Sequence, residues 1–81
     1  MMIVATMLKN KAPQAAWLVE VKDTDTDTYR RAACSTLGAA KRTAVEFASG
    51  MLDAPRHRLP WTQDEVQKAD GIQYYRAEVK S

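Results

Sequence analysis

One segment, Ser35–Leu52, constrains the fold more than any other part of the chain, because its apolar residues recur at helical spacing. The apolar positions are Leu37, Ala40, Ala44, Phe47, Ala48 and Met51. Charged residues, among them Lys41, Arg42 and Glu46, fall on the opposite side. The spacing predicts one amphipathic helix that must lay a single apolar face against another layer.

Residues at both ends of this segment are typical of helix boundaries. Ser35 or Thr36 can cap the start by accepting hydrogen bonds from the first turn. Gly50 can adopt a left-handed cap, and Pro55 disfavours helical geometry in the residue before it. We expect the helix to end between residues 49 and 53.

Strand-like segments flank the helix on both sides. Residues 1–8 are apolar, Trp17–Lys22 alternates apolar and polar residues, and Thr28–Cys34 resumes after the turn-forming run Asp23–Asp27. In Trp17–Lys22 one set of side chains faces the core and the intervening set faces the other way. Ile72–Val79, with its aromatic and β-branched residues, predicts a closing strand.

Two interpretations fit the segment before that closing strand. Thr62 with Glu65 forms a capping box for a short helix over residues 63–69. Asp70-Gly71 is instead typical of a two-residue hairpin turn. We favour a hairpin or an extended approach, because a helix of about seven residues gains little stability by itself.

The order strand, strand, strand, helix, strand predicts an α+β fold: an antiparallel sheet of about four strands with one helix packed on one face. The helix is expected to cover Trp17, Val19 and Val21. With 81 residues and no internal repeat, residues 1–81 are expected to form a single domain.

Composition argues against several functional classes. Twelve Lys and Arg residues against ten Asp and Glu give a net charge of +2, too small on its own to indicate a dedicated nucleic-acid binder. A lone cysteine, Cys34, excludes an intrachain disulfide or a cysteine-based zinc site and fits a reducing cytoplasm. The opening MMIVATML is too short to span a membrane and lacks a signal-peptide pattern.

Familiar catalytic motifs are missing as well. His57 is the only histidine, and its neighbours Arg56 and Arg58 disfavour its protonated form. There is no Gly-rich phosphate loop and no serine nucleophile elbow. We therefore predict a cytoplasmic protein that is not an enzyme and uses no cofactor or metal.

An acidic run, Asp23, Asp25 and Asp27, forms the tip of the predicted hairpin. Alternating carboxylates are typical of the start of a calcium-binding loop, but Thr28 and Cys34 replace the glycine and the glutamate that such a loop requires. We interpret the run as a solvated tip that can meet a basic patch on a partner. A weak cation site is the alternative.

Basic and aromatic residues supply further candidates for partner contact. In Pro55–Trp61 the prolines hold a loop open, and Arg56, Arg58 and Trp61 are of the types that anchor interfaces. Leu59 and Trp61 can also fold back to close one end of the core, and the two roles are compatible.

Two adjacent pairs extend this set. Neighbours on a strand point to opposite faces, so Arg30 and Arg31 are expected to diverge, as are Tyr74 and Tyr75. The outward tyrosine with Arg76 can form a surface for stacking bases or docking a protein. Cross-strand packing is the structural alternative.

The hairpin followed by TLGAAKRTAVEFASGML resembles the second half of double-stranded-RNA-binding domains, where an alanine-rich helix with a basic start follows a three-stranded sheet. Residues 1–16 predict a strand and a proline loop where those domains have an N-terminal helix. The resemblance implies a nucleic-acid-binding domain. Its contact residues would be Arg30, Arg31, Lys41, Arg42, Arg56 and Arg58.

Over all 81 residues the chain resembles small proteins of phages and mobile elements, in particular the anti-CRISPR inhibitors: a Trp-led hairpin, an Ala-rich helix, a closing aromatic strand and no catalytic motif. This resemblance implies a stoichiometric inhibitor that binds a host Cas protein or surveillance complex. It would block nucleic-acid access or nuclease recruitment. The near-neutral charge favours docking onto a protein over mimicry of DNA.

We therefore predict a non-catalytic protein-binding module, a monomer or homodimer, of the anti-CRISPR inhibitor kind. The alternatives are the nucleic-acid-binding domain and an oligomeric structural subunit. The predicted partner-contact residues are Asp23, Asp25, Asp27, Arg30, Arg31, Arg56, Arg58, Trp61, Tyr74 and Arg76.

Overall fold

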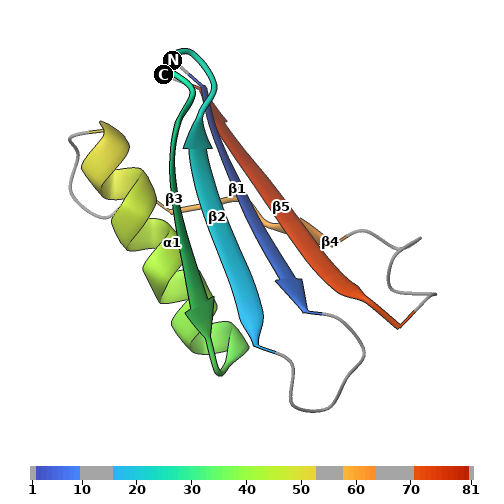
Figure 1. Ribbon diagram of the computed structural model, residues 1–81. Helices are drawn as coiled ribbons and strands as arrows, with labels where there is room; N and C mark the ends of the chain where they lie inside the picture. The colour runs from blue at the N-terminus through green and yellow to red at the C-terminus, as the bar shows by residue number, and fades with distance from the viewer. Residues whose placement is uncertain (1, 10–15, 53–57, 64–70, 81) are drawn as a thin grey trace.

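A computed structural model describes residues 2–9, 16–52, 58–63 and 71–80. Within them it shows two layers, a five-stranded antiparallel sheet and one helix packed on one of its faces (Figure 1). The elements in chain order are β1 (Met2–Lys9), β2 (Trp17–Asp23), β3 (Thr28–Cys34), α1 (Leu37–Leu52), β4 (Thr62–Gln63) and β5 (Gln73–Lys80). The predicted α+β class is confirmed.

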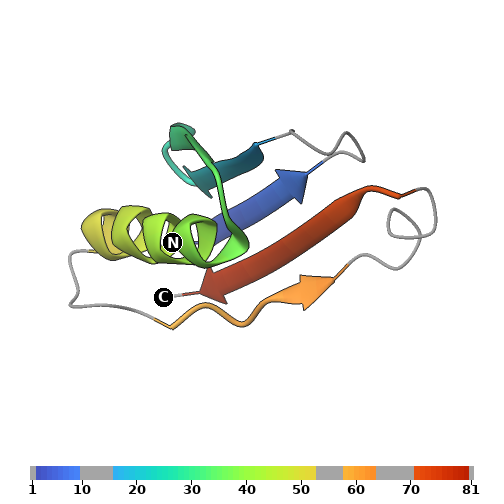
Figure 2. The same ribbon diagram turned by 90° about the horizontal axis from the view of Figure 1, so that it is seen from below.

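The strand order is β3-β2-β1-β5-β4, which places the first strand in the middle of the sheet (Figure 2). β1 pairs with β2 on one side and with β5 on the other, both antiparallel. In the second pairing Met2 lies opposite Lys80, so the two ends of the chain lie side by side (Figure 1).

The sheet has one strand more than the sequence predicted. β4 contributes Thr62 and Gln63, which pair with Arg76 and Tyr75 of β5. The Thr62 hydroxyl also donates to the carbonyl of Arg76, at 3.2 Å. Thr62 and Gln63 are therefore extended, as the favoured interpretation predicted. Residues 64–70, which hold the rest of both the helix and the hairpin interpretations, lie outside the described part of the chain.

Alternation along the strands separates a dry face from an open one. On the helix side the three central strands bury Ile3, Ala5, Met7, Trp17, Val19, Val21, Ala77 and Val79. The residues between them are half-buried or exposed. Because successive side chains point to opposite faces, this two-residue period assigns every described strand residue to one face.

The helix packs on the sheet through a seam of alanines. Ala40, Ala44 and Ala48 are fully buried, while the larger Phe47 and Met51 lie partly exposed beside the seam. Small side chains spaced four residues apart let the helix approach the sheet closely. The predicted apolar face is confirmed, with the alanines rather than the larger residues at its centre.

Both predicted helix boundaries are confirmed, since α1 begins after Thr36 and ends at Leu52, inside the predicted range of 49–53, but the predicted cap at the end is not. The Thr36 hydroxyl accepts the backbone N–H of Ala39 at 3.1 Å, which makes Thr36 the N-cap. Gly50 lies inside the helix, which continues to Leu52, and its backbone has no positive φ. The predicted left-handed cap at Gly50 is therefore wrong, because the flanking apolar residues keep the last turn packed on the core.

The turn between β2 and β3 is fixed by its own side chains. The carboxylate of Asp23 accepts the backbone N–H of Asp25 at 3.0 Å and is almost fully buried. Asp27 takes a left-handed φ of 59°, which aspartate tolerates better than most residues. The backbone N–H of Thr24 donates to the carbonyl of Met2, which ties the turn to the central strand.

The segment before β4 closes one end of the core. Leu59 is buried, and Trp61 packs against the core from a half-buried position. The closing role predicted for both residues is confirmed. Pro55, Arg56 and His57 lie outside the described residues. In the described ranges, no helix has the length and apolar character needed to cross a membrane.

Candidate functional site

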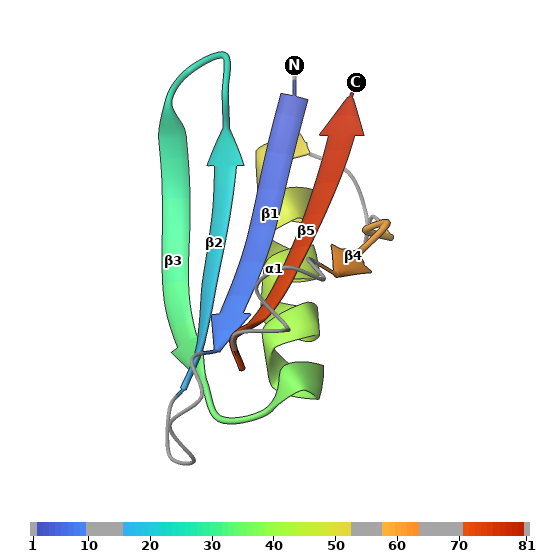
Figure 3. The same cartoon turned by 90° about the vertical axis from the view of Figure 1, so that its right-hand side faces the viewer.

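The candidate site is the open face, which we define as the side of the sheet turned away from α1 (Figure 3). None of the described elements covers it. By strand alternation and register, its residues are Tyr29, Arg31 and Ala33 on β3, Leu18, Glu20 and Lys22 on β2, Met2, Val4, Thr6 and Leu8 on β1, Tyr74, Arg76, Glu78 and Lys80 on β5, and Thr62 on β4.

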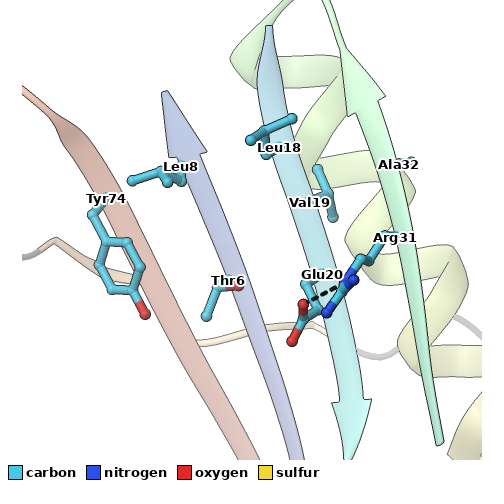
Figure 4. Close-up of a pocket in the computed structure, with 8 residues that line it drawn as sticks. All are labelled: Thr6, Leu8, Leu18, Val19, Glu20, Arg31, Ala32 and Tyr74. Carbon is cyan, nitrogen blue, oxygen red and sulfur yellow. Dashed lines mark hydrogen bonds and ion pairs between the residues drawn. The ribbon is translucent and has the colours of Figure 1, made fainter. Parts of the chain in front are cut away.

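An apolar hollow of about 520 Å³ occupies one end of the open face. Leu8, Leu18 and Tyr74 border it on one side, and Thr6, Glu20 and Arg31 on the other (Figure 4). Leu18 exposes 56% of its surface there and lies next to Leu8 and Tyr74, so the exposed apolar surface is contiguous. Four strands contribute to the hollow, so the sheet itself sets its shape.

An ion pair forms the polar border of this hollow. The Nε of Arg31 donates to Glu20 Oε2 at 2.7 Å, and the guanidinium stacks over the Tyr29 ring, 4.3 Å from its centroid. The hydrogen bond and charge of Glu20 raise the pKa of Arg31 further above its already high value. The exposed Arg31 side chain thus contacts both Glu20 and the Tyr29 ring.

Two more ion pairs lie farther along the face. Arg76 donates to Glu78 at 2.7 Å, and this bond raises the pKa of Arg76. Lys22 lies 2.8 Å from the carboxylate of Asp27. Their hydrogen bond raises the pKa of Lys22 and lowers that of Asp27. All three pairs are solvent-exposed, so each contributes little stability but fixes where charge lies.

The charges flank an uncharged central strand. Thr6 of β1 lies between Glu20 on β2 and Arg76 on β5. One pair farther along, Val4 lies between Lys22 and Glu78. Toward the hollow, Leu8 lies between Leu18 and Tyr74. The face therefore has an apolar end, a neutral middle strand and opposite charges at matching heights on its two sides.

The open face brings together three of the ten predicted contact residues, Arg31, Tyr74 and Arg76. Arg30 points to the helix side, with its guanidinium 6.0 Å from the Phe47 ring centroid. The predicted divergence of Arg30 from Arg31 is confirmed. Tyr75 likewise packs on Trp17 on the helix side, with ring centroids 6.0 Å apart, while Tyr74 faces outward.

The remaining predicted residues lie elsewhere. Asp25 and Asp27 are exposed at the hairpin tip, whereas Asp23 uses its buried carboxylate inside the turn and offers no surface. Arg58 is exposed and Trp61 is half-buried next to the core. Arg56 lies outside the described residues.

Several residues of the open face were missed as site residues. Leu18 and Glu20 carry the clearest signal, because the alternation in WLVEVK places them opposite the core-facing Trp17. Thr6 and Leu8 gave no such signal, since residues 1–8 are apolar nearly throughout. Their place on the open face depends on the pairing of β1 with β2 and β5.

No three His, Cys, Asp or Glu side chains among the described residues gather closely enough to hold a metal ion. Cys34 is half-buried, and its Sγ lies 3.5 Å from the Thr43 hydroxyl. The open face combines an exposed apolar hollow with charged groups that are paired within the chain.

Comparisons with protein-family models, with curated proteins and with solved structures gave no match for this chain.

Proposed function

We propose that this chain is a non-catalytic protein-binding module whose docking surface is the open face. The observation that carries the proposal is the exposed apolar end of that face, where Leu18 stands beside Leu8 and Tyr74 over a hollow of about 520 Å³. Exposed apolar surface bordered by charged residues is typical of protein interfaces.

Residue types on the face support the same proposal. Tyrosine and arginine are over-represented among the residues that dominate binding energy, and Tyr29, Arg31 and Tyr74 all lie on the open face. Arg31 is held by Glu20 and by the Tyr29 ring, so little side-chain entropy is lost when a partner binds.

The nucleic-acid alternative receives less support from the same geometry. Arg31 lies on the open face, whereas Arg30 contacts Phe47 on the helix side. Lys41 also lies on the helix side, 5.9 Å from the Tyr75 ring centroid. Tight phosphate binding needs several available cations on one face. These three predicted contacts are divided between two faces, and on the open face Lys22, Arg31 and Arg76 are each paired with a carboxylate.

The resemblance to anti-CRISPR inhibitors suggests which protein is bound. We propose a Cas protein or surveillance complex as the target, blocked by occlusion of its nucleic-acid or nuclease-docking surface. The purified chain, titrated into cleavage reactions of a panel of purified Cas effectors, is expected to stop cleavage by one of them near one equivalent. Undiminished cleavage by every effector at a tenfold excess would contradict this target class.

A pair of variants tests the docking surface itself. Leu18→Glu places a charge in the apolar end of the open face, whereas Arg42→Glu changes an exposed residue of α1 on the other layer. We expect tagged wild type and Arg42→Glu to capture the same protein from nuclease-treated host lysate, and Leu18→Glu to lose it. Equal capture by Leu18→Glu would refute the assignment of this face.

A further inference from the structure

We infer that the open face docks a second copy of this chain. The two copies would form a two-fold dimer whose symmetry axis lies between the two sheets, parallel to β1. The inference rests on the proposed function, because it uses the same docking surface, so a second copy and a target protein would compete for the open face. It is separable from that function, because self-association is a property of the purified chain alone.

The first observation is the uncharged central strand. On the open face β1 presents Met2, Val4, Thr6 and Leu8, all of them half-buried. A two-fold axis along a strand places that strand against its own copy, so each of these residues meets an uncharged equivalent. A charged residue on β1 would instead have met its own like charge.

The second observation is the charge pattern on the flanking strands. A two-fold axis along β1 lays β2 of one copy over β5 of the other. Glu20 and Arg76 both lie beside Thr6, so Glu20 of one copy faces Arg76 of the other. Lys22 and Glu78 both lie beside Val4, so they face each other in the same way. Symmetry makes each pair twice, giving four opposite-charge contacts and no like-charge contact among these residues.

The third observation is the apolar end. Leu18 and Tyr74 both lie beside Leu8, so the same axis places Leu18 over Tyr74 of the second copy. The hollow between these residues, about 520 Å³, leaves room for the side chains of the other copy. The most exposed leucine of the sheet thereby gains an apolar partner.

In-chain ion pairs are compatible with this arrangement. Glu20 already accepts from Arg31, and Arg76 already donates to Glu78. A carboxylate has two oxygens and can accept from two guanidinium groups, so neither bond has to break. The dimer would join the existing pairs into a network across the interface.

The area suits a reversible dimer. Four strands about 4.8 Å apart and about eight residues long present a face of roughly 500 Å² per copy. Two copies would bury about 1,000 Å² together, near the lower limit of specific interfaces. We therefore expect dissociation in the micromolar range rather than an obligate dimer.

A different two-fold axis, across the strands, gives a competing geometry. It pairs Glu20 with Lys22 and Arg76 with Glu78, also opposite charges, but it lays Leu18 over Thr24 of the second copy and separates the two apolar ends. Apolar contact favours the axis along β1. The two geometries predict different results when Glu20→Arg is mixed with Arg76→Glu, because only the axis along β1 places each reversed charge against its opposite.

The experiment uses two full-length variants, Glu20→Arg and Arg76→Glu, in sedimentation equilibrium at about 100 µM. Wild type is expected to sediment at twice the chain mass of 9.1 kDa. Each variant alone turns two attractive contacts into two repulsive ones and should dimerise at least about tenfold more weakly. Mixed in equal amounts they should form a heterodimer, because every reversed charge then meets its opposite.

Matched controls are Glu46→Arg and Arg42→Glu, the same charge changes on the exposed side of α1, which should leave dimerisation unchanged. Circular dichroism of all variants reports whether the fold is kept. A monomeric wild type, or a monomeric mixture of the two folded variants, would overturn the inference. If wild type is monomeric while Leu18→Glu still loses a captured host protein, the second copy is excluded and the proposed function stands.

Discussion

Replacing Gly50 by alanine is expected to stabilise the protein. Gly50 lies in α1 with two helical residues after it, and a Cβ built there would meet no atom within 4 Å. Alanine is favoured over glycine inside a helix by about 0.8–1.0 kcal/mol. Near the helix end we expect about 0.5–1 kcal/mol, since the last turn is less completely hydrogen-bonded.

For a domain of this size, 1 kcal/mol shifts Tm by about 4–8 °C. Gly50→Ala should therefore raise Tm by about 2–8 °C in thermal unfolding followed by circular dichroism at 222 nm. The sign of the change in Tm distinguishes a helical Gly50 from a left-handed one. A left-handed Gly50 would make the same substitution unfavourable by about 1–2 kcal/mol and lower Tm.

Gly71 provides the matched control, because it has a φ of 82°. Gly71→Ala should lower Tm, since alanine rarely adopts that backbone conformation. A fall in Tm for Gly50→Ala, comparable to that for Gly71→Ala, would refute the argument that α1 runs through residue 50.

Three further predictions concern the core and the hairpin turn. Ala44→Leu should destabilise by about 1–3 kcal/mol in urea unfolding, because Ala44 is fully buried where the helix touches the sheet; an unchanged midpoint would contradict the alanine seam. Asp23→Ala should cost about 1–2 kcal/mol because it removes the buried carboxylate that accepts the backbone N–H of Asp25, whereas Asp23→Asn keeps an acceptor and should cost less; equal losses would argue against the turn bond. Lys22→Met should raise the pKa of Asp27 toward its ordinary 3.8 in an NMR titration, and no change would exclude the ion pair. Since the pair lowers the pKa of Asp27 and raises that of Lys22, its small stabilisation is lost as pH falls below about 4 or rises above about 10.5.

Local pattern was enough to predict most elements of the fold. Apolar residues recur at helical spacing from Leu37 to Met51 and at every second position in Trp17–Lys22, because each element buries one face. The predicted helix and strand are both confirmed. The cap at Gly50 could not be excluded from the sequence, because a glycine near a helix end is compatible with either conformation. Packing of Met51 and Leu52 on the core decides it.

The candidate site was less predictable because it depends on strand order. The sequence assigns Leu18, Glu20 and Lys22 to one side of a strand, but it does not say which strand lies beside them. The position of β1 between β2 and β5 brings Leu8 and Tyr74 next to Leu18. That arrangement comes from long-range pairing, which no local pattern contains.

The central position of β1 also has a consequence for biosynthesis. Met2–Lys9 is made before the other described strands, yet its pairing with β5 waits until Gln73–Lys80 has left the ribosome. Until then one edge of a largely apolar strand stays unpaired, which is a hazard for aggregation in a nascent chain. Removal of the last strand would leave that edge permanently bare, so we expect ribosome-stalled chains that lack it to recruit chaperones.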